Sequence, residues 1–178
     1  IHTPTPKGFE IFENSYVVCK KDTVIGIFKD LPERYQAIPV FDYSGKLIIP
    51  GMADIHQHAP QYGFHGLGMA LDLDSNWNTW FMQYSLPEER HFNDLNYAEL
   101  AYEKFTNDLL RSTTTRTCTF ATIHRPATEL LMQKLADKGF AAYVGKLNMD
   151  RNSIEGLQET TEESLRETRT WLENTCEK

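Results

Sequence analysis

The first fifty residues alternate apolar and polar side chains in short runs. A period of two is typical of half-buried strands, and it predicts strands over 9–12, 16–20, 23–28, 37–43 and 47–49. Turn-forming pairs such as Lys21-Asp22 and Ser44-Gly45 separate these runs. Residues 1–49 are therefore predicted to form a small β subdomain.

After Pro50-Gly51 the pattern changes to alternating strands and helices. One strand carries His56 and His58, and two more are predicted at 113–122 and 141–149. Apolar side chains at helical spacing predict helices over 95–110, from Pro126 to Gly139 and from Thr160 to about 175, and a helix-like segment over 76–84.

Two of these helices carry signals at their ends. In the helix over 95–110, Asn96 and Glu99 resemble a capping pair, and the expected buried stripe is Ala98, Tyr102, Phe105 and Leu109. Thr160 and Glu163 form a capping box for the last helix. Trp77 and Trp80 in the segment over 76–84 are interpreted as helix packing.

The order β-α-β-α-β-α predicts parallel strands covered by helices. A closed (β/α)₈ barrel has eight such units in about 250 residues, and three fit here. The predicted fold class is α/β: an N-terminal β subdomain, 1–49, followed by the first units of a (β/α)₈ barrel, 50–178, incomplete in this chain. An open three-stranded α/β layer is the alternative, and it leaves a strand edge to be covered.

Composition and charge exclude several classes of protein. The chain has 178 residues, 40% of them hydrophobic, and a net charge of −7. No basic run is longer than Lys20-Lys21, so nucleic-acid binding is not expected. No apolar run approaches the roughly 20 residues of a membrane span, so a membrane partner is not expected either. Cys19, Cys118 and Cys176 are odd in number and far apart, which indicates a reducing, cytoplasmic setting.

His56 and His58 are the clearest candidates for chemistry. Side chains two positions apart on a strand share a face, so both imidazoles can reach one metal ion. The alternative is a pair of partly buried, hydrogen-bonded histidines. Asp54 lies on the same face, where it could orient a ligand histidine or be satisfied by backbone donors.

Other candidates follow the next two strands, at the end where barrels place their sites. His124 follows the second strand and is either a catalytic or substrate-contacting residue or a loop and capping residue. Asp150 follows the third strand and could be a site residue. With Asn148 and Asn152 close by, it is equally well interpreted as part of a turn or helix-entry cluster. Lys146 is placed within the third strand, as an interior ion pair or, less simply, as a modified lysine that bridges two metals.

Several segments together resemble a known family. The stretch 47–58, with its apolar strand, Pro-Gly and Asp-x-His-x-His, is similar to the signature of the amidohydrolase superfamily. Segments 58–62 (HAPQY), 120–124 (FATIH), 144–150 (VGKLNMD) and 159–164 (ETTEES) resemble, in this order and spacing, the guanine deaminase family within that superfamily.

The resemblance implies a metal-dependent hydrolase barrel that converts guanine to xanthine and ammonia in purine metabolism. His56 and His58 would bind one zinc ion. His58, Ala59, Pro60 and Gln61 would bind the substrate, Gln61 by hydrogen bonds to the purine. His124 occupies a matching position and is the catalytic candidate. The partners implied are guanine and a second copy of the chain, as a homodimer.

Two histidines do not complete a catalytic zinc site. The family's remaining ligands and proton shuttle are expected beyond Lys178, so the isolated chain is expected to be inactive and to bind metal weakly. Three alternatives stay open: an aminohydrolase for another ring amine, a truncated partner-binding module, and a cupin-type metal-binding barrel. The last is disfavoured because 59–68 holds no acidic residue.

Overall fold

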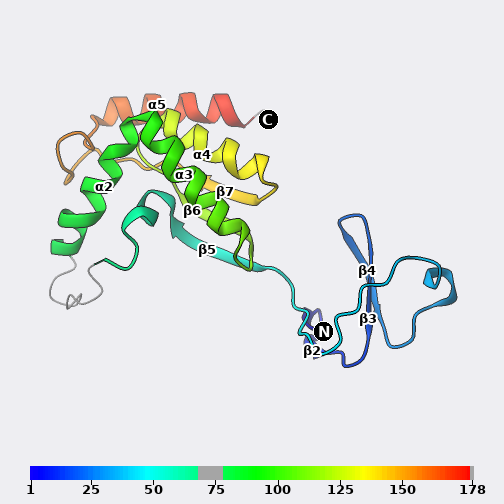
Figure 1. Cartoon of the computed structure of the whole chain (residues 1–178). Coiled ribbons are helices and arrows are strands. Elements are labelled where there is room, and N and C mark those ends of the chain that lie inside the picture. Colours follow the sequence, from blue (N-terminus) through cyan, green and yellow to red (C-terminus); the bar gives the residue numbers. More distant parts are fainter. Residues whose placement is uncertain (68–77, 177–178) are drawn as a thin grey trace. The chain divides into compact units, whose positions relative to one another are not determined.

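The computed structural model describes residues 1–67 and 78–176 (Figure 1). The chain divides into two compact units, Ile1–Gly51 and Met52–Lys178. The first contains strands and one short 3₁₀ turn, whereas the second combines a parallel sheet with helices. The protein is therefore of the α/β class.

The first unit contains two antiparallel hairpins. Strand β1 (His2–Thr5) pairs with β2 (Gly8–Ile11), and β3 (Tyr16–Lys20) pairs with β4 (Thr23–Phe28). A 3₁₀ turn, η1, follows at Glu33–Tyr35. The predicted strands over 9–12, 16–20 and 23–28 are confirmed, β2 with a shift of one residue, whereas β1 was not predicted.

The predicted strands over 37–43 and 47–49 are wrong, because neither segment is a strand. A strand is stabilised by a neighbour, and strand-forming side chains do not by themselves supply one. Pro39 also lacks the N–H that a paired strand needs. Val40 and Phe41 are consequently 60% and 78% exposed.

The second unit is built on a three-stranded parallel sheet in the order β5-β6-β7. Its strands are β5 (Met52–His58), β6 (Thr114–Phe120) and β7 (Ala141–Gly145). Helices α3 (Leu95–Leu110), α4 (Arg125–Asp137) and α5 (Thr161–Thr175) follow the strands in turn. In Figure 1, α3 and α4 lie against the sheet and α5 lies beside α4. The predicted parallel order is confirmed.

A shared core joins the helices to the sheet. The predicted stripe of α3 is buried, and α4 adds three apolar side chains from its own inner face. Residues of this core include Ala98, Tyr102, Phe105, Leu109, Ala121, Ala127, Leu131 and Leu135. None of the helices in the described part of the chain has the length and apolar character that crossing a membrane requires.

The ends of the elements refine the prediction. Asp94, rather than the predicted Asn96, caps α3, because the helix starts at Leu95 and the Asp94 carboxylate accepts the Asn96 N–H. The capping box of Thr160 and Glu163 is confirmed at α5. Strand β7 ends at Gly145, four residues earlier than predicted.

Residues 59–67 and 78–93 connect β5 to α3 through short helical turns. These are η2 (Ala59–Phe64), the π-helical turn η3 (Phe81–Ser85), α2 (Leu86–Arg90) and η4 (His91–Asn93). The segment predicted over 76–84 is helical from residue 78 onward and continues to 93. Pro87 does not interrupt it, because Pro87 stands in the first turn of α2, where its missing N–H costs nothing. Trp77 lies outside the described residues.

Glu103 ties α3 to α4 and gives a prediction about pH. Its carboxylate bonds Lys134 (2.8 Å) and Lys138 (2.9 Å), and these hydrogen bonds, the one from Lys134 first, lower the pKa of Glu103 to about 2. The stabilisation is present above the ordinary pKa of 4.5. It is lost as the pH falls toward 2. Urea unfolding should show that Glu103→Gln lowers stability at pH 7 and has no effect near pH 2.

Glu173→Gln, at an exposed position on α5, is the matched control for that measurement. A stability difference for Glu103→Gln that stays constant from pH 7 to pH 2 would contradict the assignment.

Candidate active site

His56 and His58 lie together at the carboxyl end of β5. Their ring centroids are 5.2 Å apart with the planes nearly perpendicular, at 81°. Phe120, at the end of β6, packs against both rings, with centroid distances of 5.8 Å to His56 and 5.0 Å to His58. The register between β5 and β6 shifts between Asp54 and Gln57, and such bulges re-aim side chains next to functional sites.

The environment of His58 suits a metal ligand. Its Nδ1 atom is buried and has no hydrogen-bond partner among the described residues. Burial lowers the pKa of His58, and the nearby His56 lowers it further. The imidazole is therefore neutral at pH 7, the form whose free lone pair binds metal. A buried nitrogen without a partner is costly, and a metal ion is one partner that satisfies it.

The described residues supply these two nitrogens and no cluster of three or more metal-ligating side chains. Asp54 accepts a hydrogen bond from the backbone N–H of His56 (3.2 Å). Of the two roles expected for Asp54 from the sequence, this contact matches the one in which backbone donors satisfy its carboxylate. The geometry thus offers half of a tetrahedral metal site.

The turn η2 places Gln61 three residues after His58. Ala59 and Pro60 are buried, and Gln61 is half-buried. The Nε2 atom of Gln61 donates to Ser85 Oγ (2.9 Å) and to Glu89 Oε1 (3.1 Å). Gln61 is therefore anchored by side chains from η3 and α2.

Ser85 and Glu89 were missed by the sequence interpretation, although both are almost completely buried, at 0% and 1% exposure. Burial raises the pKa of Glu89, and the hydrogen bonds from Gln61 and Ser85 oppose this increase. The serine followed by Pro87 and an acidic first turn was an available signal for a helix start.

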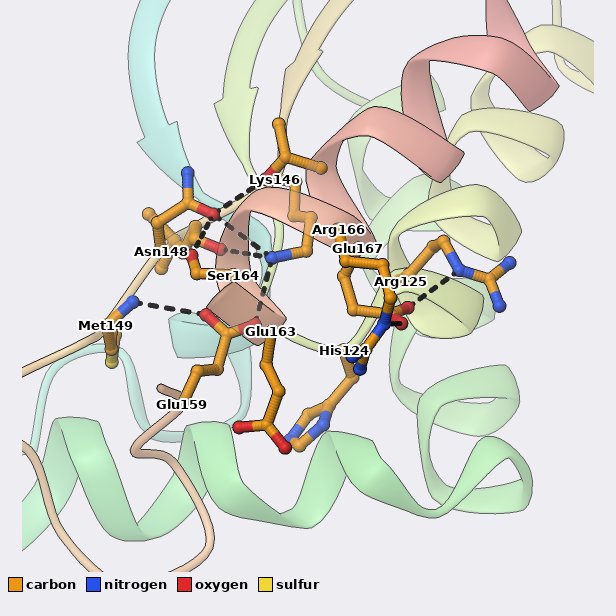
Figure 2. A network of polar contacts seen from close by, with 12 residues as sticks. His124, Arg125, Lys146, Asn148, Met149, Glu159, Glu163, Ser164, Arg166 and Glu167 are labelled. Atoms are coloured by element: carbon orange, nitrogen blue, oxygen red, sulfur yellow. Dashed lines mark hydrogen bonds and ion pairs between the residues drawn. The ribbon is translucent and has the colours of Figure 1, made fainter. Parts of the chain in front are cut away.

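His124 stands at the N-terminus of α4, beyond the end of β6. Its Nε2 atom is buried without a partner in the described structure, and burial lowers the pKa of His124, with Glu159 opposing. A cavity of about 460 Å³ adjoins it, with Arg125, Glu159, Glu163 and Glu167 in the lining. Figure 2 shows His124 next to this charged network.

Lys146 is the centre of that network (Figure 2). Its buried ammonium group donates to Leu147 O (2.9 Å), Asn148 Oδ1 (3.2 Å) and Glu159 Oε1 (3.3 Å). The predicted place within the third strand is wrong by one residue, because β7 ends at Gly145. The interior ion pair with Glu159 is present.

Asp150 belongs to the turn that leads toward α5. Its carboxylate accepts hydrogen bonds from Arg151 (2.8 Å) and Thr161 (2.9 Å), which lower the pKa of Asp150 to about 2. Asn148 Oδ1 likewise accepts from Ser164 (2.7 Å). These contacts agree with the turn and helix-entry interpretation.

Comparison with known sequences gives one family and a consistent set of relatives. The sequence model described as "Amidohydrolase family" matches residues 47–176. The guanine deaminase of Dictyostelium discoideum is 40% identical over 97% of this chain and 41% of its own length. Those of Homo sapiens and Escherichia coli are 37% and 34% identical, over 75% and 76% of this chain and 29% and 30% of their lengths.

Solved structures agree with the sequence relatives. The guanine deaminase of C. acetobutylicum, with guanine bound in its active site, superposes with a TM-score of 0.88 at 35% identity, over 99% of this chain and 42% of that one. The E. coli guanine deaminase gives 0.77 at 28% identity, over 94% and 37%. This chain thus spans about two fifths of the length of those two proteins.

Proposed function

Because this chain belongs to the amidohydrolase family, we propose that it forms part of an enzyme that hydrolyses guanine to xanthine and ammonia, a reaction of purine catabolism or salvage. The observation that carries the proposal is the pair His56 and His58 beside the anchored Gln61, which follows His58 by three residues. The buried Nδ1 of His58 has no hydrogen-bond partner among residues 1–67 and 78–176. The bound guanine of the C. acetobutylicum structure supports the choice of substrate.

In this proposal, β5, β6 and β7 with their helices are the first units of a (β/α)₈ barrel, 50–178, preceded by the β subdomain, 1–49. The three strands are parallel and adjacent, as barrel strands are. His56, His58 and His124 lie at or beyond carboxyl ends of strands, where barrels place their chemistry.

His56 and His58 would hold one zinc ion, to which imidazole nitrogen is well suited. When bound, zinc in such a site makes water a competent nucleophile at neutral pH. A catalytic zinc takes at least three protein ligands, so the remaining ones would come from beyond these 178 residues. The alignment with about two fifths of the relatives' length supports this.

Gln61 would hydrogen-bond the purine, and the buried Ala59 and Pro60 would form the wall against which the ring lies. His58 would contact the substrate from the metal side. His124 is the catalytic candidate: its lowered pKa keeps the ring neutral at pH 7, so that Nε2 can accept or donate a proton according to tautomer.

We also propose a cytoplasmic homodimer. Cys19, Cys118 and Cys176 are exposed free thiols, which suits a reducing compartment. Light scattering coupled to gel filtration would test the dimer, and a mass equal to one chain would contradict it.

The test of the function is an assay on the longer polypeptide that contains these residues. Xanthine and ammonia should appear from guanine, disappear on chelation and return with zinc. Activity on a cytosine, triazine or adenosine-like ring without activity on guanine would contradict the substrate and favour another aminohydrolase.

Gln61→Ala should damage guanine use selectively. Loss of one hydrogen bond to a buried ring corresponds to about a tenfold increase in KM, with a smaller change in kcat because the metal ligands are untouched. Steady-state kinetics with Gln36→Ala, an exposed glutamine, as control would check this. An unchanged KM for guanine would contradict the role of Gln61.

A further inference from the structure

Within the described part of the chain, the side-chain amide of Gln61 is held through its nitrogen only. Its Nε2 atom approaches Ser85 Oγ at 2.9 Å and Glu89 Oε1 at 3.1 Å. Ser85 Oγ in turn donates to the same Glu89 oxygen at 3.3 Å. These three side chains, which we call the amide clamp, therefore form a closed triangle of polar contacts around the nitrogen of Gln61.

The chemistry of the clamp fixes which end of the amide faces which way. An ionised carboxylate can only accept hydrogen bonds, so Glu89 requires the NH₂ end of Gln61. The carbonyl oxygen of the same planar group is then turned away from Glu89. Among the described residues, Gln61 Oε1 has no hydrogen-bond donor.

The clamp is also built on a rigid support. Ser85 and Glu89 are four residues apart on the continuous helical run of η3 and α2, and both are at most 1% exposed. The second carboxylate oxygen of Glu89, Oε2, is buried without a partner in the described structure. A buried, incompletely paired carboxylate costs folding free energy, which points to a role other than stability.

We propose that Glu89, acting with Ser85, is the positioning residue that holds Gln61 with its carbonyl oxygen toward the substrate, so that the site accepts a hydrogen bond from a ring N–H of the purine. This rests on the proposed function, in which Gln61 contacts guanine. A side-chain amide can both donate and accept hydrogen bonds. In Gln61 the donor, Nε2, is occupied by Ser85 and Glu89, so the acceptor, Oε1, is the atom left for the substrate.

A specificity consequence follows from the same geometry. A ring that presents a lone pair at this position would meet the lone pairs of Gln61 Oε1 and lose the contact. Sites built around one buried polar group reject the mismatched ligand strongly, because that group is left unpaired. The amide clamp would therefore select the protonated nitrogen edge of the ring.

The decisive variant is Glu89→Gln, which preserves shape but can donate to the carbonyl of Gln61 and so permits the amide to turn. Its matched control is Glu88→Gln, the preceding residue on α2, whose carboxylate accepts from the Tyr97 hydroxyl. Glu89→Gln removes the buried charge while keeping nearly the same side-chain volume. Circular dichroism would verify that both variants are folded.

Two measurements separate the clamp from the proposed function. In this chain, the ¹⁵N-labelled side-chain amide resonances of Gln61 should shift in Glu89→Gln and stay in place in Glu88→Gln. In the longer enzyme, Glu89→Gln should raise KM for guanine about tenfold with kcat within about threefold. In a Gln61→Ala background, the same change should have no further effect on KM, because residues in one network are not additive.

Unmoved Gln61 resonances in Glu89→Gln would overturn the clamp and leave guanine deamination intact. An equal KM increase with and without Gln61 would also overturn it, because Glu89 would then act independently of the amide. Absence of guanine turnover in the unmodified longer enzyme would instead refute the proposed function, and the amide resonances would still decide whether Glu89 orients Gln61.

Discussion

If the proposed function is right, replacing His58 with alanine is expected to abolish the proposed zinc-dependent deamination of guanine, lowering kcat/KM by more than about a thousandfold. Changes to groups that merely support a metal ligand cost ten- to a hundredfold, and losing a ligand should cost more. His58 is the stronger test of the pair because its Nδ1 is buried without a partner in the described structure, whereas His56 is exposed. His56→Ala should show the same direction.

The measurement has two parts: metal content of the purified longer enzyme by elemental analysis, and steady-state kinetics with added zinc. His2→Ala, in the other unit of the chain, is the control for loss of a histidine. Full zinc content together with normal turnover in His58→Ala would refute the assignment of the metal site.

Sequence periodicity was sufficient to locate the parallel strands and the helices α3, α4 and α5, because their patterns are amphipathic and locally consistent. The stripe of α3 and the capping box of Thr160 and Glu163 predict helix positions that the structure confirms. The strand prediction over 37–43 failed because strand formation there is not decided by the local pattern. Whether an apolar segment pairs depends on a neighbouring backbone, which the composition of residues such as Val40 and Phe41 does not reveal.

The candidate site was only partly predictable. The spacing of His56 and His58 on one strand predicts that they lie together. Their proximity is confirmed by the distance of 5.2 Å between their ring centroids. Ser85 and Glu89 contact Gln61 across more than twenty residues of sequence, from a helical run that contains a π-helical turn. π-Helical turns are rare in proteins, but those that occur are frequently at functional sites. No local sequence pattern linked η3 to Gln61.

Leu131→Ala is expected to have the largest effect on stability, about 3 kcal/mol of the free energy of unfolding. Leu131 on α4 is 0% exposed and belongs to the core cluster that includes Tyr102 and Phe105 of α3. The loss has two parts: the transfer free energy of the removed carbons, and the free-energy cost of the cavity they leave. The cavity stays open because neighbouring side chains hold the two helices apart. A decrease in Tm of about 10 °C should follow.

Leu100→Ala makes the same chemical change on the outer face of α3, where the side chain is 74% exposed. It should shift the free energy of unfolding by no more than about 0.5 kcal/mol. Urea unfolding followed by helical circular dichroism would compare the two, since the helices lie in the second unit. Equal effects of the two substitutions would mean that α4 does not pack on α3 as described. The position of His124, at the start of α4, would then also be contradicted.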